Sequence, residues 1–164
     1  MPKKKTTVVK EPPAEKEDLC KCYISRDVAG KIDGSGDGTG ESFWINKLSP
    51  TRAEVRNNCL CGLCVGDIIE IVENGPNGWK NEVVSVVERQ SEPYTYKYDF
   101  PDMENSAKFP KECSEFISNL QNKGIRFEGM VKGLAMLSRP KTMTVNDFEE
   151  NLKGGPITFT PFTE

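Results

Sequence analysis

Residues 67–100 read DIIEIVENGPNGWKNEVVSVVERQSEPYTYKYDF and contain the transition between two kinds of pattern. Two runs rich in β-branched residues, 67–73 and 79–89, are joined by Asn, Gly and Pro, which are typical of a hairpin connection. Aromatic and polar residues then alternate from position 94 to 100, a pattern that predicts a strand. The stretch therefore predicts a β-rich region ending near Gln90 and a second unit that begins with a strand.

The region before this stretch also has the period of β-strands. Residues 20–25 alternate between apolar and polar side chains, and residues 42–48 form another short strand pattern. Short strands joined by turns, without a helical period, predict a small antiparallel β-barrel-like domain over residues 20–90. Residues 33–41 (DGSGDGTGE) partly imitate a calcium loop but have no glutamate at the twelfth position, so we expect a plain loop between two strands.

The region after this stretch alternates between strands and helices. A helix is predicted over residues 110–123, because apolar residues recur there every three or four positions. Strands are expected over residues 125–129 and 132–138, followed by a second helix and a last strand over residues 157–162. The resulting βαββαβ order predicts a ferredoxin-like domain over residues 91–164, and the predicted fold class is α+β.

Charge and composition limit the possible partners. The first stretch, residues 1–19, is rich in Lys, Glu and Pro and predicts a disordered tail. The 164 residues include 22 basic and 25 acidic side chains, a net charge of −3, which argues against nucleic acid and favours a protein partner. Because no apolar run approaches the ~20 residues of a membrane span, and no secretory signal is recognisable, we expect a cytoplasmic protein without a membrane partner.

The chain contains no histidine. Catalytic Ser-His and Cys-His pairs and His-metal sites are therefore excluded within this chain. Acidic residues are common, but none stands in a motif that implies general acid–base chemistry. We therefore expect a protein that is not an enzyme.

The candidate site in the sequence is a cysteine cluster. Two tight groups, C-K-C and C-L-C-G-L-C, contain five of the six cysteines: Cys20, Cys22, Cys59, Cys61 and Cys64. Sulfur ligands in a tetrahedral arrangement suit zinc, so these five residues are candidate ligands of a structural Zn site. The alternative is a group of reduced thiols without a metal. The sixth cysteine, at position 113, lies on the apolar face of the first predicted helix and is expected in the core.

The leading prediction is a non-catalytic binding or interaction protein, regulatory or adaptor in kind, with a structural cysteine cluster. Two alternatives remain open. Cys61 and Cys64 have the spacing of the dithiol of a thiol-disulfide oxidoreductase, although a strand rather than the usual helix follows them. The predicted ferredoxin-like sheet could also bind RNA by stacking bases on Tyr94, Tyr96 and Tyr98, unless these rings pack on the two helices.

Two short motifs resemble a known family. GDII at residues 66–69 and VVER at residues 86–89, placed before an alternating strand, are similar to a family of uncharacterised bacterial proteins. In that family a small β-barrel precedes a βαββαβ half. The resemblance covers about residues 42–164 and implies the fold but no activity, while the cysteine cluster and the glycine-rich stretch before Phe43 depart from the family pattern.

Overall fold

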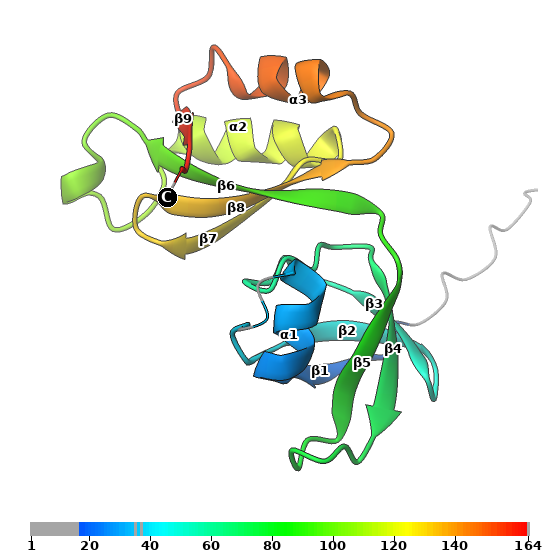
Figure 1. Ribbon diagram of the computed structural model, residues 1–164. Helices are drawn as coiled ribbons and strands as arrows, with labels where there is room; N and C mark the ends of the chain where they lie inside the picture. Colours follow the sequence, from blue (N-terminus) through cyan, green and yellow to red (C-terminus); the bar gives the residue numbers. More distant parts are fainter. Residues whose placement is uncertain (1–16, 35, 37, 164) are drawn as a thin grey trace, which may run out of the picture.

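The computed structural model describes residues 17–34, 36 and 38–163 and places them in two units, a barrel and a sheet with helices (Figure 1). A disordered tail is predicted over residues 1–19, and residues 1–16 of it lie outside the described residues. Leu19, at its end, already belongs to the first strand. None of the helices in the described ranges has the length and apolar character of a membrane span.

The first unit is a closed barrel of five strands in sequence order. Its strands are β1 (Leu19–Ile24), β2 (Glu41–Ser49), β3 (Arg52–Val55), β4 (Ile68–Glu73) and β5 (Asn81–Glu88). Successive strands pair antiparallel, whereas β1 and β5 close the barrel with a parallel pairing between Tyr23 and Glu82. The predicted small barrel is confirmed, with this parallel seam and the short strand β3 as unpredicted features.

Strand alternation fills the barrel interior. Cys22 of β1 lies opposite Phe43 of β2, and Ile24 and Ile45 also point into the same buried core. Because successive side chains of a strand point to opposite faces, Lys21 and the other odd-numbered residues of β1 face outward. The outward face of β1 and β2 thus lies on the barrel surface, while two cysteine-bearing segments contribute to its core.

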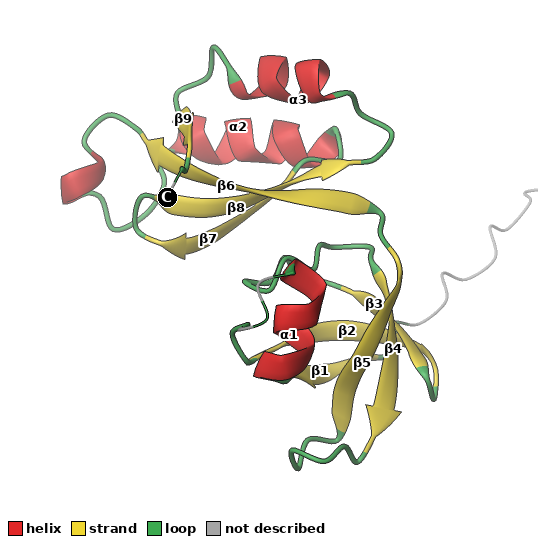
Figure 2. Ribbon diagram, in the orientation of Figure 1, coloured by secondary structure: helices red, strands yellow, loops and turns green. Residues whose placement is uncertain are grey.

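A short helix, α1 (Arg26–Asp33), follows β1 and packs against β5, where the sequence pattern predicted only strands and loops (Figure 2). Ser25 caps its first turn by accepting a hydrogen bond from the Val28 backbone N–H, and Gly34 ends it with φ of 77°. Gly30 in the middle lowers the helix propensity. Val28 and Ile32 do lie four positions apart on one face, but Gly30 between them and the glycine-rich stretch after Asp33 favour a loop, which explains the missed prediction.

The glycine-rich stretch after α1 serves close packing. A Cβ atom at Gly38 would lie 2.5 Å from the Ala29 Cβ and 2.2 Å from the Gly30 backbone N, so only glycine fits. The Arg26 Nε also donates to the Gly38 carbonyl at 3.3 Å. Positions 35 and 37 of the calcium-like pattern lie outside the described residues.

The second unit is an antiparallel four-stranded sheet in the order β7-β8-β6-β9. Its elements are β6 (Ser91–Asp99), the short 3-10 helix η1 (Met103–Asn105), α2 (Lys111–Asn122), β7 (Arg126–Val131), β8 (Leu134–Pro140), α3 (Val145–Leu152) and β9 (Thr158–Pro161). Both α2 and α3 lie on one side of the sheet, and the barrel lies on the other side (Figure 1). The predicted α+β class and the alternation of strands and helices are confirmed.

The core of the second unit lies between the sheet and its helices. The ring of Phe148 on α3 lies 5.1 Å from that of Tyr94 and 6.2 Å from that of Tyr96, measured between centroids. Tyr96 is buried together with Leu137 and Leu120, in contact with the helices. The tyrosines proposed as an RNA platform therefore pack toward the helices, while Thr95 and Lys97, which alternate with them, point to the opposite face.

Candidate functional site

The loop between β3 and β4 carries three of the five cysteines predicted to bind zinc. Cys59, Cys61 and Cys64 are all buried there. The loop turns tightly at Gly62, which has φ of 89° and whose N–H donates to the Cys59 carbonyl at 3.0 Å. The Cys59 Sγ donates to the Asn57 carbonyl at 3.3 Å. The spacing C-L-C-G-L-C thus gives a compact, buried turn.

The other two predicted ligands lie in β1. Cys22 faces the barrel core, and Cys20 is partly buried beside Asn81, whose Nδ2 donates to the Cys20 Sγ at 3.7 Å. Within the described residues, no group of three or more Cys, Asp or Glu side chains is arranged to hold a metal ion. The zinc site predicted from the five cysteines therefore receives no support here.

Burial keeps three of these thiols, those of Cys22, Cys59 and Cys64, protonated. Removal from water raises the pKa of both Cys22 and Cys64 to about 12, with the nearby Asp67 carboxylate adding to the effect on Cys64. The hydrogen bond with Cys61, together with burial, raises the pKa of Cys59 far above the ordinary thiol range. The thiolate is the form that attacks disulfides and binds metals. Cys22, Cys59 and Cys64 consequently behave as small apolar core residues at neutral pH.

A fully buried carboxylate, Asp67, ties the cysteine loop to the connection between the two units. Its oxygens accept hydrogen bonds from the Cys64 N–H at 2.9 Å and from the Gln90 N–H at 2.8 Å. Arg89 forms an ion pair with it at 3.2 Å and donates to the Gly62 carbonyl. Asp67 therefore links the cysteine loop to the segment at Gln90 that leads out of the barrel. The motif GDII does not by itself predict this structural role.

Asn58 makes the direct link between the cysteine loop and the sheet. Its Nδ2 donates to the Ser138 Oγ at 3.4 Å and to the Arg126 carbonyl at 3.5 Å, while its Oδ1 accepts from the Val65 N–H at 3.1 Å. Ser138 and Asn58 are both buried. The cysteine loop is thus the part of the barrel that contacts the sheet face opposite the helices.

A small cavity of about 220 Å³ lies at this junction. Its lining includes Glu41, Cys59, Leu60, Glu128 and Met136. Glu41 accepts a hydrogen bond from the Cys61 N–H at 3.1 Å, and burial raises the pKa of Glu128. Among the described residues, the lining contributes two carboxyl groups and the buried thiol of Cys59, and no basic side chain.

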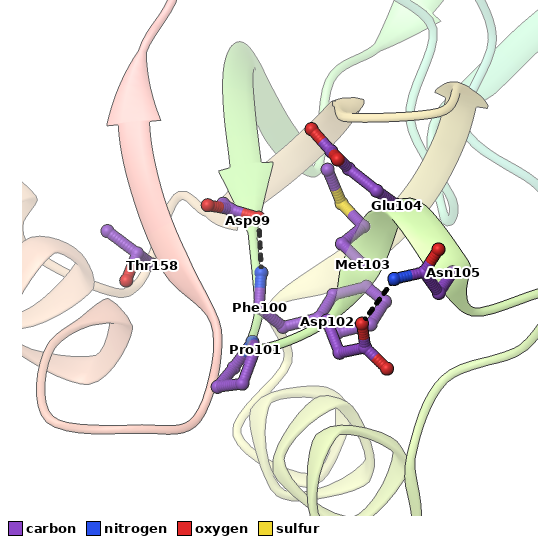
Figure 3. A pocket seen from close by; sticks show the side chains of 8 residues that line it. All are labelled: Asp99, Phe100, Pro101, Asp102, Met103, Glu104, Asn105 and Thr158. Atoms are coloured by element: carbon purple, nitrogen blue, oxygen red, sulfur yellow. Dashed lines mark hydrogen bonds between the residues drawn. The ribbon is translucent and has the colours of Figure 1, made fainter.

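A larger cavity of about 500 Å³ lies at the far end of β6, around η1 (Figure 3). Two of its three carboxylates form hydrogen bonds within the loop: Asp99 accepts from the Phe100 N–H at 2.9 Å, and Asp102 accepts from the Asn105 Nδ2 at 2.7 Å. The sequence patterns did not single out these residues. The cavity is acidic and partly apolar, and the carboxylates of Asp99 and Asp102 form local hydrogen bonds that shape the loop.

The barrel surface carries a row of aromatic and basic side chains that we call the aromatic strip: Trp79, Tyr23, Lys21 and Trp44. Tyr23 and Trp79 stack with ring centroids 5.1 Å apart and planes 7° apart. Lys21 lies directly across from Trp44 in the strand pairing, with its Nζ 4.6 Å from the ring centroid. Trp44 is 48% exposed and Trp79 is 41% exposed. The strip therefore extends from the turn between β4 and β5, which carries Trp79, across β1 to Trp44 in β2.

A buried carboxylate fixes the hairpin that presents Trp79. Glu82 is 3% exposed and accepts hydrogen bonds from the Asn77 N–H at 2.9 Å and the Trp79 N–H at 3.3 Å. Its side chain fills the space where Gly75 would carry a Cβ. Trp79 is consequently held against Tyr23 by an ordered turn between β4 and β5.

Sequence reasoning missed the aromatic strip, although the signal was present. Phe43 and Ile45 mark the inward face of β2, so Trp44 between them must face outward. Tyr23 alternates in the same way with Cys22 and Ile24 in β1. Large aromatic residues on the outward face of an alternating strand indicate a candidate interaction surface.

Comparisons with known proteins leave the function open. No protein-family model and no curated protein matches the sequence. Among solved structures, the chain is similar to one titled "Novel crystal structure of a hypothetical protein from Neisseria gonorrhoeae", with 12% sequence identity and a TM-score of 0.41. The match covers 87% of this chain and 96% of that chain. A likeness of this degree assigns neither fold nor activity to the chain.

Proposed function

We propose that the protein is a non-catalytic binding protein, regulatory or adaptor in kind, and that the aromatic strip is its contact surface for a partner protein. The observation that carries the proposal is the pair of half-exposed tryptophans, Trp44 and Trp79, on one continuous surface. Tryptophan is among the residues that most often dominate binding energy at protein interfaces. Contiguous exposed apolar side chains are typical of sites where another protein binds.

The cysteines support this proposal because their thiols are buried and do not have the properties of a catalytic thiol. Cys59, Cys61 and Cys64 are at most 2% exposed, and Cys64 has a pKa of about 12. A catalytic thiol requires access for its substrate and a lowered pKa. The oxidoreductase alternative with Cys61 and Cys64 is therefore the weaker hypothesis, and the cysteine loop is proposed as a structural junction in a protein whose free thiols fit a cytoplasmic setting.

We also assign the second unit to the ferredoxin-like class. Its chain order, β6-α2-β7-β8-α3-β9, and its sheet order, β7-β8-β6-β9, support this assignment. RNA binding on its sheet is less favoured, because the tyrosines pack against the helices and the face toward the barrel contains the buried residues Met136 and Ser138. The net charge of −3 also favours a protein partner over RNA.

The test compares three full-length baits in extracts of the source cells: the native protein, the double variant Trp44→Ala, Trp79→Ala, and Val145→Ala. Val145 on α3 is 46% exposed and is the matched control for loss of an exposed apolar side chain. We expect a partner that the native protein and Val145→Ala retain. Its affinity, remeasured with purified components, should fall about 30-fold in the double variant, which is the effect of losing about 2 kcal/mol at a hot spot.

Thermal unfolding of each bait checks that the variants are folded. Equal recovery of every bound protein by all three baits would overturn the proposal. Recovery of material that disappears after nuclease treatment would replace it with nucleic-acid binding.

A further inference from the structure

A groove of about 490 Å³ lies between α1 and β5 and shares no residue with the aromatic strip. Its apolar lining comes from Val28 and Ile32 of α1 and from the second half of β5. Three basic residues, Lys31, Arg89 and Lys141, complete the rim. No acidic side chain lines the groove in the part of the chain that the structure describes, although α1 itself contains two aspartates.

The apolar floor of the groove results from two irregularities in β5. The pairing with β4 skips Val84 and Val87, at shifts between Val83 and Ser85 and between Val86 and Glu88. A bulge changes the direction of the side chain it contains. Val84 and Val87 line the groove and are 47% and 44% exposed, so both irregularities place an apolar residue in water.

The same part of β5 has a free backbone edge. On the side away from β4, β5 pairs with β1 through Tyr23 and Glu82, and no pairing beyond Glu82 is present among the described residues. An edge strand with unpaired N–H and C=O groups can accept a further strand from another chain. Such a strand would lie along the groove and over Val84 and Val87.

The charges at the rim favour an acidic occupant. Arg89 already pairs with Asp67, but Lys31 and Lys141 form no ion pair within the described residues. Carboxylates between these lysines would find opposite charge, and none of the described lining residues is acidic. An aliphatic lipid chain fits less well, because a floor nearly half exposed would leave it in water and because it cannot pair with a strand edge.

We propose that this groove binds an extended, acidic segment of a partner protein, which pairs with the edge of β5 and places apolar side chains on Val84 and Val87. The proposal goes beyond the aromatic strip in naming a second contact surface and the chemistry of its occupant.

The probe is an array of synthetic peptides of about 12 residues, in which net charge and apolar content vary independently, screened with labelled full-length protein. We expect the retained peptides to combine acidic residues with alternating apolar ones. Their affinity should fall at least 10-fold in Lys31→Glu, Lys141→Glu and should be unchanged in Lys108→Glu, Lys111→Glu, which alters the net charge equally. Substitution of Val87 by Asp should also abolish binding, and circular dichroism of each variant checks the fold.

Several results would overturn the proposal. One is peptide binding without a preference for acidic residues, and another is equal affinity in both double-lysine variants. Displacement of the peptides by dodecanoate at low concentration would show a lipid site instead. Loss of peptide binding in Trp44→Ala, Trp79→Ala would transfer the site to the aromatic strip, which overturns the groove and leaves the proposed function in place.

Discussion

Asp67 shows how a single residue links the cysteine loop to the rest of the molecule. Its carboxylate is fully buried, accepts two backbone N–H groups and pairs with Arg89. A buried carboxylate is tolerated when hydrogen bonds and an opposite charge replace its hydration. Asp67 thus holds together two parts of the chain: the turn at Cys64 and the segment at Gln90, where the chain leaves the barrel.

We predict that Asp67→Ala lowers the free energy of unfolding by about 2–4 kcal/mol, because two backbone donors and one guanidinium lose their buried partner. Urea unfolding followed by circular dichroism measures the change. The control is Glu70→Ala in β4, where the exposed carboxylate accepts a hydrogen bond from the Ser85 hydroxyl and an effect within about 0.5 kcal/mol is expected. Equal effects of the two substitutions would contradict this role of Asp67.

The sequence predicts residue roles only in part. It correctly groups Cys59, Cys61 and Cys64, because they are neighbours in the chain. It cannot show that burial protonates Cys64 or that Asp67 faces Arg89, since both depend on contacts between segments about twenty residues apart. The core position of Cys113 follows from helical spacing alone and is confirmed.

At the scale of elements, strong periodicity was sufficient and weak periodicity was not. The alternating strand β6 and the amphipathic helices α2 and α3 follow directly from their patterns. The elements missed were β3, with four residues, the 3-10 helix η1, with three, and α1, with eight residues around Gly30. Short elements gain most of their stability from tertiary packing, which a local pattern does not contain.

The packing of α1 leads to a prediction about Gly38. Replacement by alanine places a Cβ against backbone atoms of Ala29 and Gly30, so we expect a loss of about 1–3 kcal/mol and faster hydrogen exchange in α1. Gly129→Ala is the control, because the nearest atom to its added Cβ would be 3.9 Å away on Phe127. Unchanged exchange in α1 of Gly38→Ala would show that the glycine is not needed for this contact.

On the scale of the whole molecule, the barrel contacts the sheet through a loop of buried thiols. Asn58 bridges this loop to Ser138 and Arg126, and Asp67 holds it to the connection between the units. The helices occupy the other side of the sheet (Figure 1). The aromatic strip and the groove beside α1, the two surfaces that we propose for partners, lie on the outward side of the barrel.

The measurement that tests this account most directly is the rate at which iodoacetamide labels each cysteine in the native protein at pH 8, read by mass spectrometry of peptides. With a pKa of about 12, only about one Cys64 thiol in 10⁴ is ionised at that pH. The account predicts that Cys61 and Cys64 react at least about 100-fold more slowly than in urea, because both are buried. Labelling of either residue in the native protein as fast as in urea would contradict a structural role and restore the thiol-enzyme hypothesis.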